Sequence, residues 1–240
     1  MTTVERRTLR IRETIATVTA DAEYIPAAAA EIVRRRHDIE EYIRSDPGFL
    51  TALQPYPVAR DAPDVVRRMA RATAGVGVGP MAAVAGAIAE CAVRAMTAAG
   101  ADHAIVDNGG DIAMRISRPV TVGIFAGSSP IRDAALRFEP GEDLVSICTS
   151  SGTVGHSLSF GRADAAVAIA HDAALADAAA TALGNGVQAR DPSAIEAVMA
   201  PLHAAGVTGL LVIIGDLLIA SGEVPPIVRA VIPRDRITQG

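Results

Sequence analysis

The sequence predicts an α+β fold in which a largely antiparallel sheet packs against alanine-rich helices. Short apolar segments separated by turn residues follow one another in runs, helical segments bracket these runs, and strand–helix–strand alternations are few. Of the residues, 50% are hydrophobic but only 3% are aromatic, so Ile, Val, Leu and Ala must build the core. A chain of 240 residues can form a single domain over 1–240, or two closely packed subdomains.

The first hundred residues predict a sheet edge followed by helices. Thr, Ile and Val in partial alternation indicate one or two edge strands over 8–20. Pro26 suits the first turn of a helix that continues to about Arg44, where Asp46-Pro47-Gly48 ends it. The remaining elements expected here are a loop over 49–62, a short helix over 63–72 and a helix over 81–99.

The rest of the chain predicts strands joined by tight turns. Asn108-Gly109 is a strong hairpin signal between strands over 103–107 and 111–117. We expect a third strand, over 120–125, to pair with the strand over 111–117. Further expected elements are strands over 134–138, 144–148, 163–170 and 228–232, a helix of about three turns whose first half carries Asp172 and Asp177, a helix over 192–205, and a hairpin over 208–220 with Gly215-Asp216 at its turn.

The charged residues exclude several functional classes. All 22 basic residues are Arg, and the absence of Lys excludes Schiff-base chemistry and a P-loop lysine. A net charge of −5 argues against general binding to nucleic acid or to an anionic membrane. Arg34–Arg36 form only a local cluster, which we interpret as a solvated helix face.

The cysteines and the apolar segments predict a cytoplasmic protein. Cys91 and Cys148 lie in apolar sequence, as in a reduced protein, and no disulfide framework is expected. The N-terminus has no apolar segment typical of a secretion signal. The longest apolar stretch, over 210–220, is too short to span a bilayer.

Residues 146–186 are expected to hold the chemistry. Between Thr149 and Ser159 the chain carries six hydroxyl side chains, two glycines and His156, and Asp177 and Thr181 then share one helix face. Two oxygen ligands facing such a loop suit Mg²⁺ and the phosphates that it accompanies. The alternative, which composition alone favours, is that Asp177 caps an alanine-rich helix and the loop is a polar turn.

Two further patterns are less specific. The sequence Gly77-x-Gly79-x-x-Ala82 mimics a dinucleotide fingerprint, but arginines precede it where the fingerprint needs a buried strand. We therefore interpret these small residues as allowing close helix packing or the close approach of a ligand. Ser150 or Ser157 with His156 would suit a serine hydrolase, although the chain lacks a Gly-x-Ser-x-Gly elbow.

Three motifs together resemble the ApbE-like superfamily, whose founding branch is FAD:protein FMN transferase. They are Asn-Gly-Gly-Asp at 108–111, Thr-Ser-Ser-Gly at 149–152 and Ala-Asp-Ala-Ala-Ala-Thr-Ala-Leu at 176–183. The whole chain is similar to a shorter bacterial and archaeal branch of that superfamily. The resemblance implies a T-fold-like core and a site for FAD and Mg²⁺.

The resemblance also assigns roles to residues of this chain. In the transferases the Asp and Thr of the last motif hold Mg²⁺ at the FAD pyrophosphate, and these roles would fall on Asp177 and Thr181. The family's Gly-Gly-Asp turn lines the flavin site. The candidate cofactor-binding residues are therefore Gly109, Gly110, Asp111, Thr149, Ser150, Ser151 and Gly152.

The chain departs from the transferases in two places. It lacks their His-x-x-Asp-Pro-x-Thr-Gly motif, and it cannot carry the lysine of their glycine/alanine helix. His156 and Asp177 remain as candidate catalytic residues. The sequence thus predicts an FAD-binding protein with a Mg²⁺-assisted pyrophosphate site, either a divergent FMN transferase or a non-catalytic nucleotide-binding or accessory protein. The expected partners are a nucleotide, an acceptor protein and a second copy in a homodimer, with no nucleic acid and no membrane.

Overall fold

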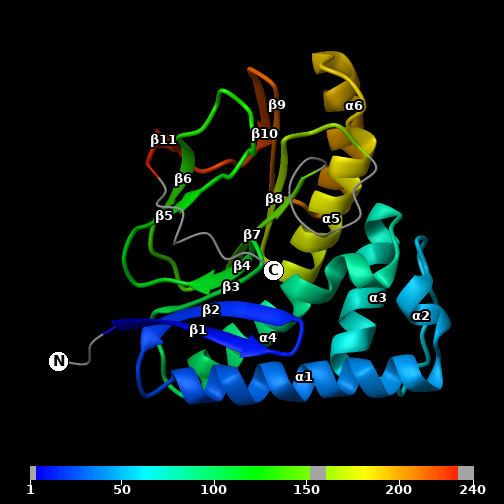
Figure 1. The fold of residues 1–240 in the computed structure, drawn as a ribbon, viewed down its shortest axis with the longest axis vertical. Coiled ribbons are helices and arrows are strands. Elements are labelled where there is room, and N and C mark those ends of the chain that lie inside the picture. Colours follow the sequence, from blue (N-terminus) through cyan, green and yellow to red (C-terminus); the bar gives the residue numbers. More distant parts are fainter. Residues whose placement is uncertain (1–3, 152–160, 232–240) are drawn as a thin grey trace.

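The computed structural model, which describes residues 4–151 and 161–231, is built on an eight-stranded sheet (Figure 1). Its strand order is β1-β2-β3-β4-β7-β8-β9-β10, and all its described pairings are antiparallel. The strands are β1 (Val4–Ile11), β2 (Thr14–Asp21), β3 (Ala104–Asn108), β4 (Asp111–Arg115), β7 (Val145–Ser150), β8 (Ala165–Ala170), β9 (Gly209–Ile214) and β10 (Leu217–Gly222). A second sheet, in the order β11-β6-β5, consists of β5 (Val120–Gly123), β6 (Ala134–Phe138) and β11 (Ile227–Arg229).

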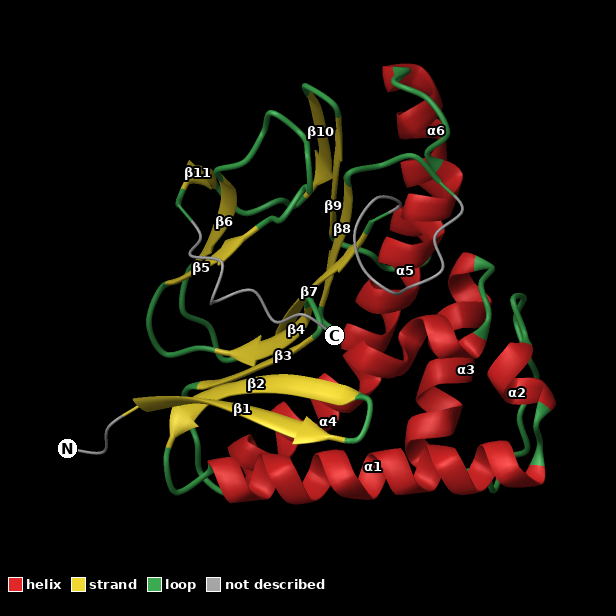
Figure 2. Cartoon of the chain, in the orientation of Figure 1, coloured by secondary structure: helices red, strands yellow, loops and turns green. Residues whose placement is uncertain are grey.

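Helices cover one face of the large sheet, and the small sheet covers the other (Figures 1 and 2). The helical segments are α1 (Ile25–Ser45), α2 (Gly48–Thr51), α3 (Asp64–Val76), the 3₁₀ turn η1 (Pro80–Ala83), α4 (Val84–Ala98), α5 (Ala173–Gly186) and α6 (Pro192–Ala204). The sequence of β8 accounts for its place between the two layers. Its even-numbered residues, such as Ala168, pack with α5 and α6, and its odd-numbered residues, such as Val167, pack with β6.

Helix α4 lies in the centre of the helical layer, between α1, α5 and the sheet. Its small residues let the neighbouring helices come close. A Cβ atom on Gly86 would lie 2.1 Å from the carbonyl oxygen of Ala173 and 2.8 Å from the Cβ of Asp177. Glycine is therefore required where α4 crosses α5.

The segment Pro80–Ala98, which joins η1 and α4, is also long and apolar enough to cross a membrane. It is the one such helix among the residues that the structure describes, and 56% of its apolar window is buried inside the protein. The core helix of a soluble protein meets the same criterion, so this is weak evidence for a membrane span.

The predicted fold class is confirmed, as are the two predicted hairpins. Asn108 pairs with Asp111, and Gly109 and Gly110 take the positive φ values of 72° and 105° that the turn requires. Gly215, at the turn between β9 and β10, also has a positive φ of 60°. Pro26 stands in the first turn of α1 as predicted.

Other predictions for single elements were wrong or too short. The strand over 120–125 does not pair with β4, because β5 pairs with β6 in the second sheet. The strand predicted to end at Cys148 continues to Ser150, since Thr149 and Ser150 pair with Val167 and Ala166. Helices α3 and α5 are each longer than predicted, and a short helix, α2, interrupts the expected loop over 49–62.

The close crossing of α4 and α5 predicts that Gly86→Ala destabilises the protein. The added methyl group would force the helices apart, and overpacking of this kind costs roughly 1–3 kcal/mol. Gly75→Ala is a matched control, because Gly75 is exposed in α3 and its Cβ would meet only Ala205, at 3.7 Å. In chemical denaturation we expect the control to be neutral or stabilising. Equal stability of the two variants would contradict the crossing.

Candidate functional site

The candidate site is built around Asp177, in the second turn of α5. Its side chain is 8% exposed, and its Oδ2 accepts a hydrogen bond of 2.9 Å from the backbone N–H of Gly86. Gly86 belongs to the first turn of α4, whose N-cap residue, Ala83, provides no side-chain hydrogen bond among the described residues. Asp177 therefore caps α4 from a different helix.

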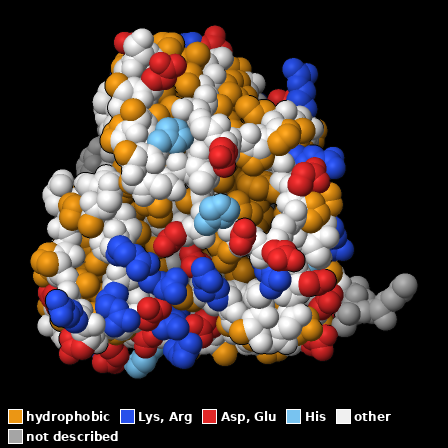
Figure 3. Space-filling view, turned by 180° about the vertical axis from the view of Figure 1, so that it is seen from behind, with side chains coloured by type: hydrophobic (Ala, Val, Ile, Leu, Met, Phe, Trp, Pro, Cys, Tyr) orange, Lys and Arg blue, Asp and Glu red, His pale blue; other side chains and the backbone are white. Residues whose placement is uncertain are grey.

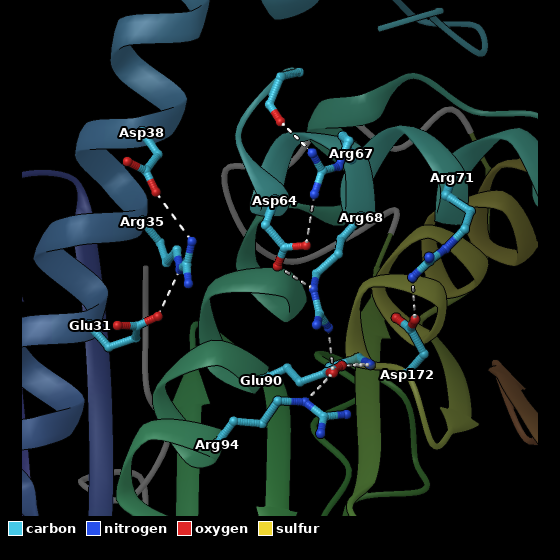
Figure 4. Close-up of polar contacts among 12 residues, drawn as sticks. Glu31, Arg35, Asp38, Asp64, Arg67, Arg68, Arg71, Glu90, Arg94 and Asp172 are labelled. Atoms are coloured by element: carbon cyan, nitrogen blue, oxygen red, sulfur yellow. Dashed lines mark hydrogen bonds and ion pairs between the residues drawn. The ribbon is translucent and has the colours of Figure 1, made fainter. Parts of the chain in front are cut away.

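A second carboxylate makes the reverse connection, from α4 to α5. Glu90 is 2% exposed, and its Oε2 accepts a hydrogen bond of 2.7 Å from the backbone N–H of Ala173, the first residue of α5. Its Oε1 accepts from Arg68 at 3.0 Å and from Arg94 at 2.8 Å (Figure 4). Each helix thus places one buried carboxylate at the N-terminal turn of the other.

The Asn-Gly-Gly-Asp turn lies against the same end of α4. The Asn108 side chain donates a hydrogen bond of 3.1 Å to the carbonyl oxygen of Ala85, next to Gly86. Within the turn, the N–H of Gly110 donates to the Asp107 carboxylate at 2.9 Å. These contacts hold the turn at the start of α4, and the charge of Asp177 acts on Asp111, the first residue of β4.

Both aspartates have raised pKa values, and the charge of Asp177 contributes to the shift of Asp111. Burial raises the pKa of Asp177 to about 7, although the backbone N–H groups of Gly86 and Ala85 act in the opposite direction. Burial, and then the charge of Asp177, raise the pKa of Asp111 well above its ordinary range. Both carboxylates therefore resist carrying a full charge near neutral pH, and a bound cation would relieve this repulsion.

Cys148 completes this buried cluster on the sheet. It lies opposite Asp111 in the pairing of β4 with β7, and it is fully buried. Burial and the charges of Asp111 and Asp177 raise the pKa of its thiol well above the usual range. The thiol therefore stays protonated and is not poised as a nucleophile.

The structure brings most of the predicted segments together. A backbone hydrogen bond from Thr149 and a side-chain hydrogen bond from Cys148 both favour the ionised form of Asp111, so the Thr-Ser-Ser segment meets the Gly-Gly-Asp turn. Thr181 is half-buried on the Asp177 helix. Ser151 is half-buried, whereas Ser150 is buried within β7 and is not presented as a nucleophile. The predicted residues Gly152, His156 and Ser157 lie outside the described residues.

Sequence reasoning missed Gly86, Glu90 and the part that Cys148 plays in the cluster. A signal for Glu90 was present, because it is the single acidic residue in the apolar helix Val84–Ala98. A carboxylate on a helix that is otherwise buried needs partners inside the protein. The partner helix could not be named without the fold.

The donor set fits Mg²⁺ better than a transition metal. No group of three or more His, Cys, Asp or Glu side chains in 4–151 and 161–231 is arranged to hold a metal ion. Structural zinc needs such a group. Mg²⁺, in contrast, keeps several waters and is commonly held by one or two carboxylates together with substrate phosphates. Asp111 and Asp177 form a pair of this kind.

A hollow elsewhere on the surface is not part of this site. It has a volume of about 650 Å³ and lies between the C-terminal half of α4 and the loop before β7; its lining includes Arg94, Arg115 and His171 but neither Asp111 nor Asp177. On the face seen in Figure 3, arginine and acidic side chains are interleaved, and many of them form ion pairs. That face therefore offers no single-sign charge for a polyanion.

Comparison with known proteins identifies the family. A family model described as "AbpE bacteria" matches residues 2–205. The chain belongs to this ApbE-like family. A "UPF0280 protein" of Methanocella arvoryzae is 51% identical over 232 residues, which cover 96% of this chain and 94% of the relative. A "UPF0280 protein" of Methanothrix thermoacetophila is 48% identical over 237 residues, which cover 98% and 99%.

Solved structures share the ApbE fold at low sequence identity. The Pseudomonas stutzeri flavinyl transferase ApbE, in its apo form, superposes with a TM-score of 0.60 at 13% identity, covering 92% of this chain and 94% of that chain. The Vibrio cholerae flavin transferase ApbE gives a TM-score of 0.58 at 14% identity, with coverages of 91% and 97%. These matches confirm the predicted ApbE-type core.

The raised pKa of Asp177 predicts how Asp177→Asn changes stability with pH. A folded-state pKa of about 7, above the ordinary 3.8, means that the proton on Asp177 stabilises the fold at low pH and that this contribution is lost as the pH rises through 7. Asparagine keeps the acceptor for Gly86 and carries no charge. We therefore expect Asp177→Asn to match the wild type at pH 4 and to be more stable at pH 8, by on the order of 1–4 kcal/mol.

Urea denaturation at several pH values measures this difference. Asp191→Asn is the control, because Asp191 caps α6 at an exposed position where asparagine caps equally well. If Asp177→Asn were less stable than the wild type at every pH, Asp177 would act mainly as a charged cap of α4.

Proposed function

We propose that this protein binds FAD, or a related pyrophosphate nucleotide, together with Mg²⁺ at the Asp111–Asp177 pair. The single observation that carries the proposal is the pair itself: the buried carboxylate of Asp177 acts electrostatically on the half-buried carboxylate of Asp111, next to the glycine turn. Two such groups are costly to bury without a cation. The kinship with an ApbE-like family, and the flavin transferases that share the fold, support the choice of ligand.

The described residues supply different parts of this site. Asp177, with Thr181 one turn later, would hold Mg²⁺, and Asp111 would face it from the sheet. Gly109 and Gly110 give the turn an open backbone, and a Cβ on Gly110 would meet nothing within 4 Å. The hydroxyl groups of Thr149 and Ser151, both half-buried, would donate hydrogen bonds to phosphate oxygens. When bound, Mg²⁺ would neutralise charge on the pyrophosphate.

Binding is better supported than transfer of FMN. Transfer needs a base placed on the acceptor hydroxyl and a surface that docks the acceptor, because in-line displacement depends on close alignment. The motif that characterises the transferases, His-x-x-Asp-Pro-x-Thr-Gly, is absent from this sequence. His156 stays the candidate base on sequence grounds alone. A non-catalytic nucleotide-binding or accessory role is therefore the second candidate.

We expect FAD with Mg²⁺ to raise the melting temperature. At 100 times the dissociation constant a ligand stabilises the folded state by about 2.7 kcal/mol, which is roughly 5–10 °C for a chain of this length. Differential scanning fluorimetry with Mg²⁺ alone, FAD alone and both together measures the shift. Asp177→Asn should lose most of the shift, and the matched substitution Asp191→Asn should keep it. Equal shifts in both variants would remove Asp177 from the site.

We expect little or no transfer of FMN to an acceptor peptide that bears the transferase target motif. The physical reason is the missing motif that would position the acceptor hydroxyl. In-gel flavin fluorescence of the acceptor, after incubation with FAD and Mg²⁺, reads the outcome directly. A fluorescent acceptor band with wild-type protein that disappears with Asp177→Asn would overturn this expectation and assign full transferase activity.

A further inference from the structure

Glu90 is a buried carboxylate that is not one of the proposed ligand-binding residues. It is 2% exposed in the middle of α4, and apolar residues flank it on both sides. An ionised carboxylate is costly to bury unless hydrogen bonds and opposite charges compensate it. The partners of its two carboxylate oxygens therefore have to explain why Glu90 is buried.

Three donors from three elements converge on Glu90. One oxygen accepts from the backbone N–H of Ala173, at 2.7 Å, and the other accepts from Arg68 of α3 and Arg94 of α4, at 3.0 and 2.8 Å (Figure 4). Arg68 is itself held by Asp64, at 2.8 Å. The two arginines balance the charge of Glu90, and the remaining contact fixes the first residue of α5.

The contact with Ala173 forms a closed ring with the contact of Asp177. Glu90 follows Gly86 by four residues on α4, and Asp177 follows Ala173 by four residues on α5, so each pair lies on one helix face. Four residues span about 6 Å along a helix. Each helix thus donates one backbone N–H and accepts with a side chain about one turn further along, so two separate bonds, rather than one, fix the orientation of α5 on α4.

We propose that Glu90 is a positioning residue for Asp177: by fixing the N-terminus of α5 on α4, it sets the place of the Asp177 carboxylate beside Asp111. The inference rests on the proposed function in one respect, namely that Asp177 binds Mg²⁺. Glu90 itself touches neither the metal nor the nucleotide.

Two conservative substitutions separate reach from charge. Glu90→Gln keeps the length of the side chain and an oxygen that can accept from Ala173, but it removes the charge. Glu90→Asp keeps the charge for Arg68 and Arg94, but it withdraws the carboxylate from Ala173 by one methylene. Because positioning depends on reach, we expect Glu90→Gln to bind Mg²⁺ like the wild type and Glu90→Asp to bind it roughly 10–100-fold more weakly.

The control is Leu136→Ala, which destabilises the protein from the opposite side of the large sheet. Leu136 is fully buried in β6. The buried residues that pack around it come from the two sheets and the segments that connect them, and not from α4 or α5. Titration calorimetry with Mg²⁺ alone, at a temperature where all variants are folded, gives the affinities. Amide hydrogen exchange of Gly86, the donor to Asp177, reports the second bond of the ring without any metal.

The outcomes distinguish the two proposals. Weakened Mg²⁺ binding and faster exchange of Gly86 in Glu90→Asp, with neither change in Glu90→Gln or Leu136→Ala, support positioning. Wild-type affinity and exchange in Glu90→Asp overturn it, and so does a loss in Glu90→Gln alone, which would show a role for charge. If the wild type binds no Mg²⁺, the proposed function fails, and the exchange of Gly86 decides the positioning role by itself.

Discussion

The exchange of two buried carboxylates between α4 and α5 is the interaction on which the candidate site depends. Asp177 accepts from Gly86 at the start of α4, and Glu90 accepts from Ala173 at the start of α5. Each helix dipole presents its positive end to the carboxylate that the other helix supplies. The ring is therefore both a cap for two helices and a frame that holds one acid against the sheet.

The same packing of α4 against α5 explains why negative charge on the two site aspartates is unfavourable. The two carboxylates, of Asp111 and Asp177, have pKa values raised by burial, and among the described residues no arginine forms an ion pair with either of them. Glu90, on α4, has two arginine partners. The fold thus compensates the charge of one buried acid and leaves Asp111 and Asp177 uncompensated, at the place where we propose that a cation binds.

Local sequence signals predicted the elements that depend on local chemistry, and distant contacts decided the rest. The Asn108-Gly109 turn and the start of α1 at Pro26 follow from backbone preferences, so the sequence was sufficient. The pairing of β5 could not be found in this way, because β6 and the distant β11 determine the small sheet. At the site, the motifs located Asp111 and Asp177, but Gly86 and Glu90 became relevant only when α4 lay on α5.

The alanine-rich composition gave no functional signal in the sequence, but it lets α4 and α5 approach closely enough to form this site. Bulky residues at Ala173 or Gly86 would hold α4 and α5 apart and break both hydrogen bonds of the ring. Close packing also excludes water from Asp177, and the loss of hydration raises its pKa toward neutrality. With a pKa of about 7, the proposed binding of a cation would displace the proton of this carboxylate near neutral pH. The small side chains of the helical core thus set the chemistry of the acid that they surround.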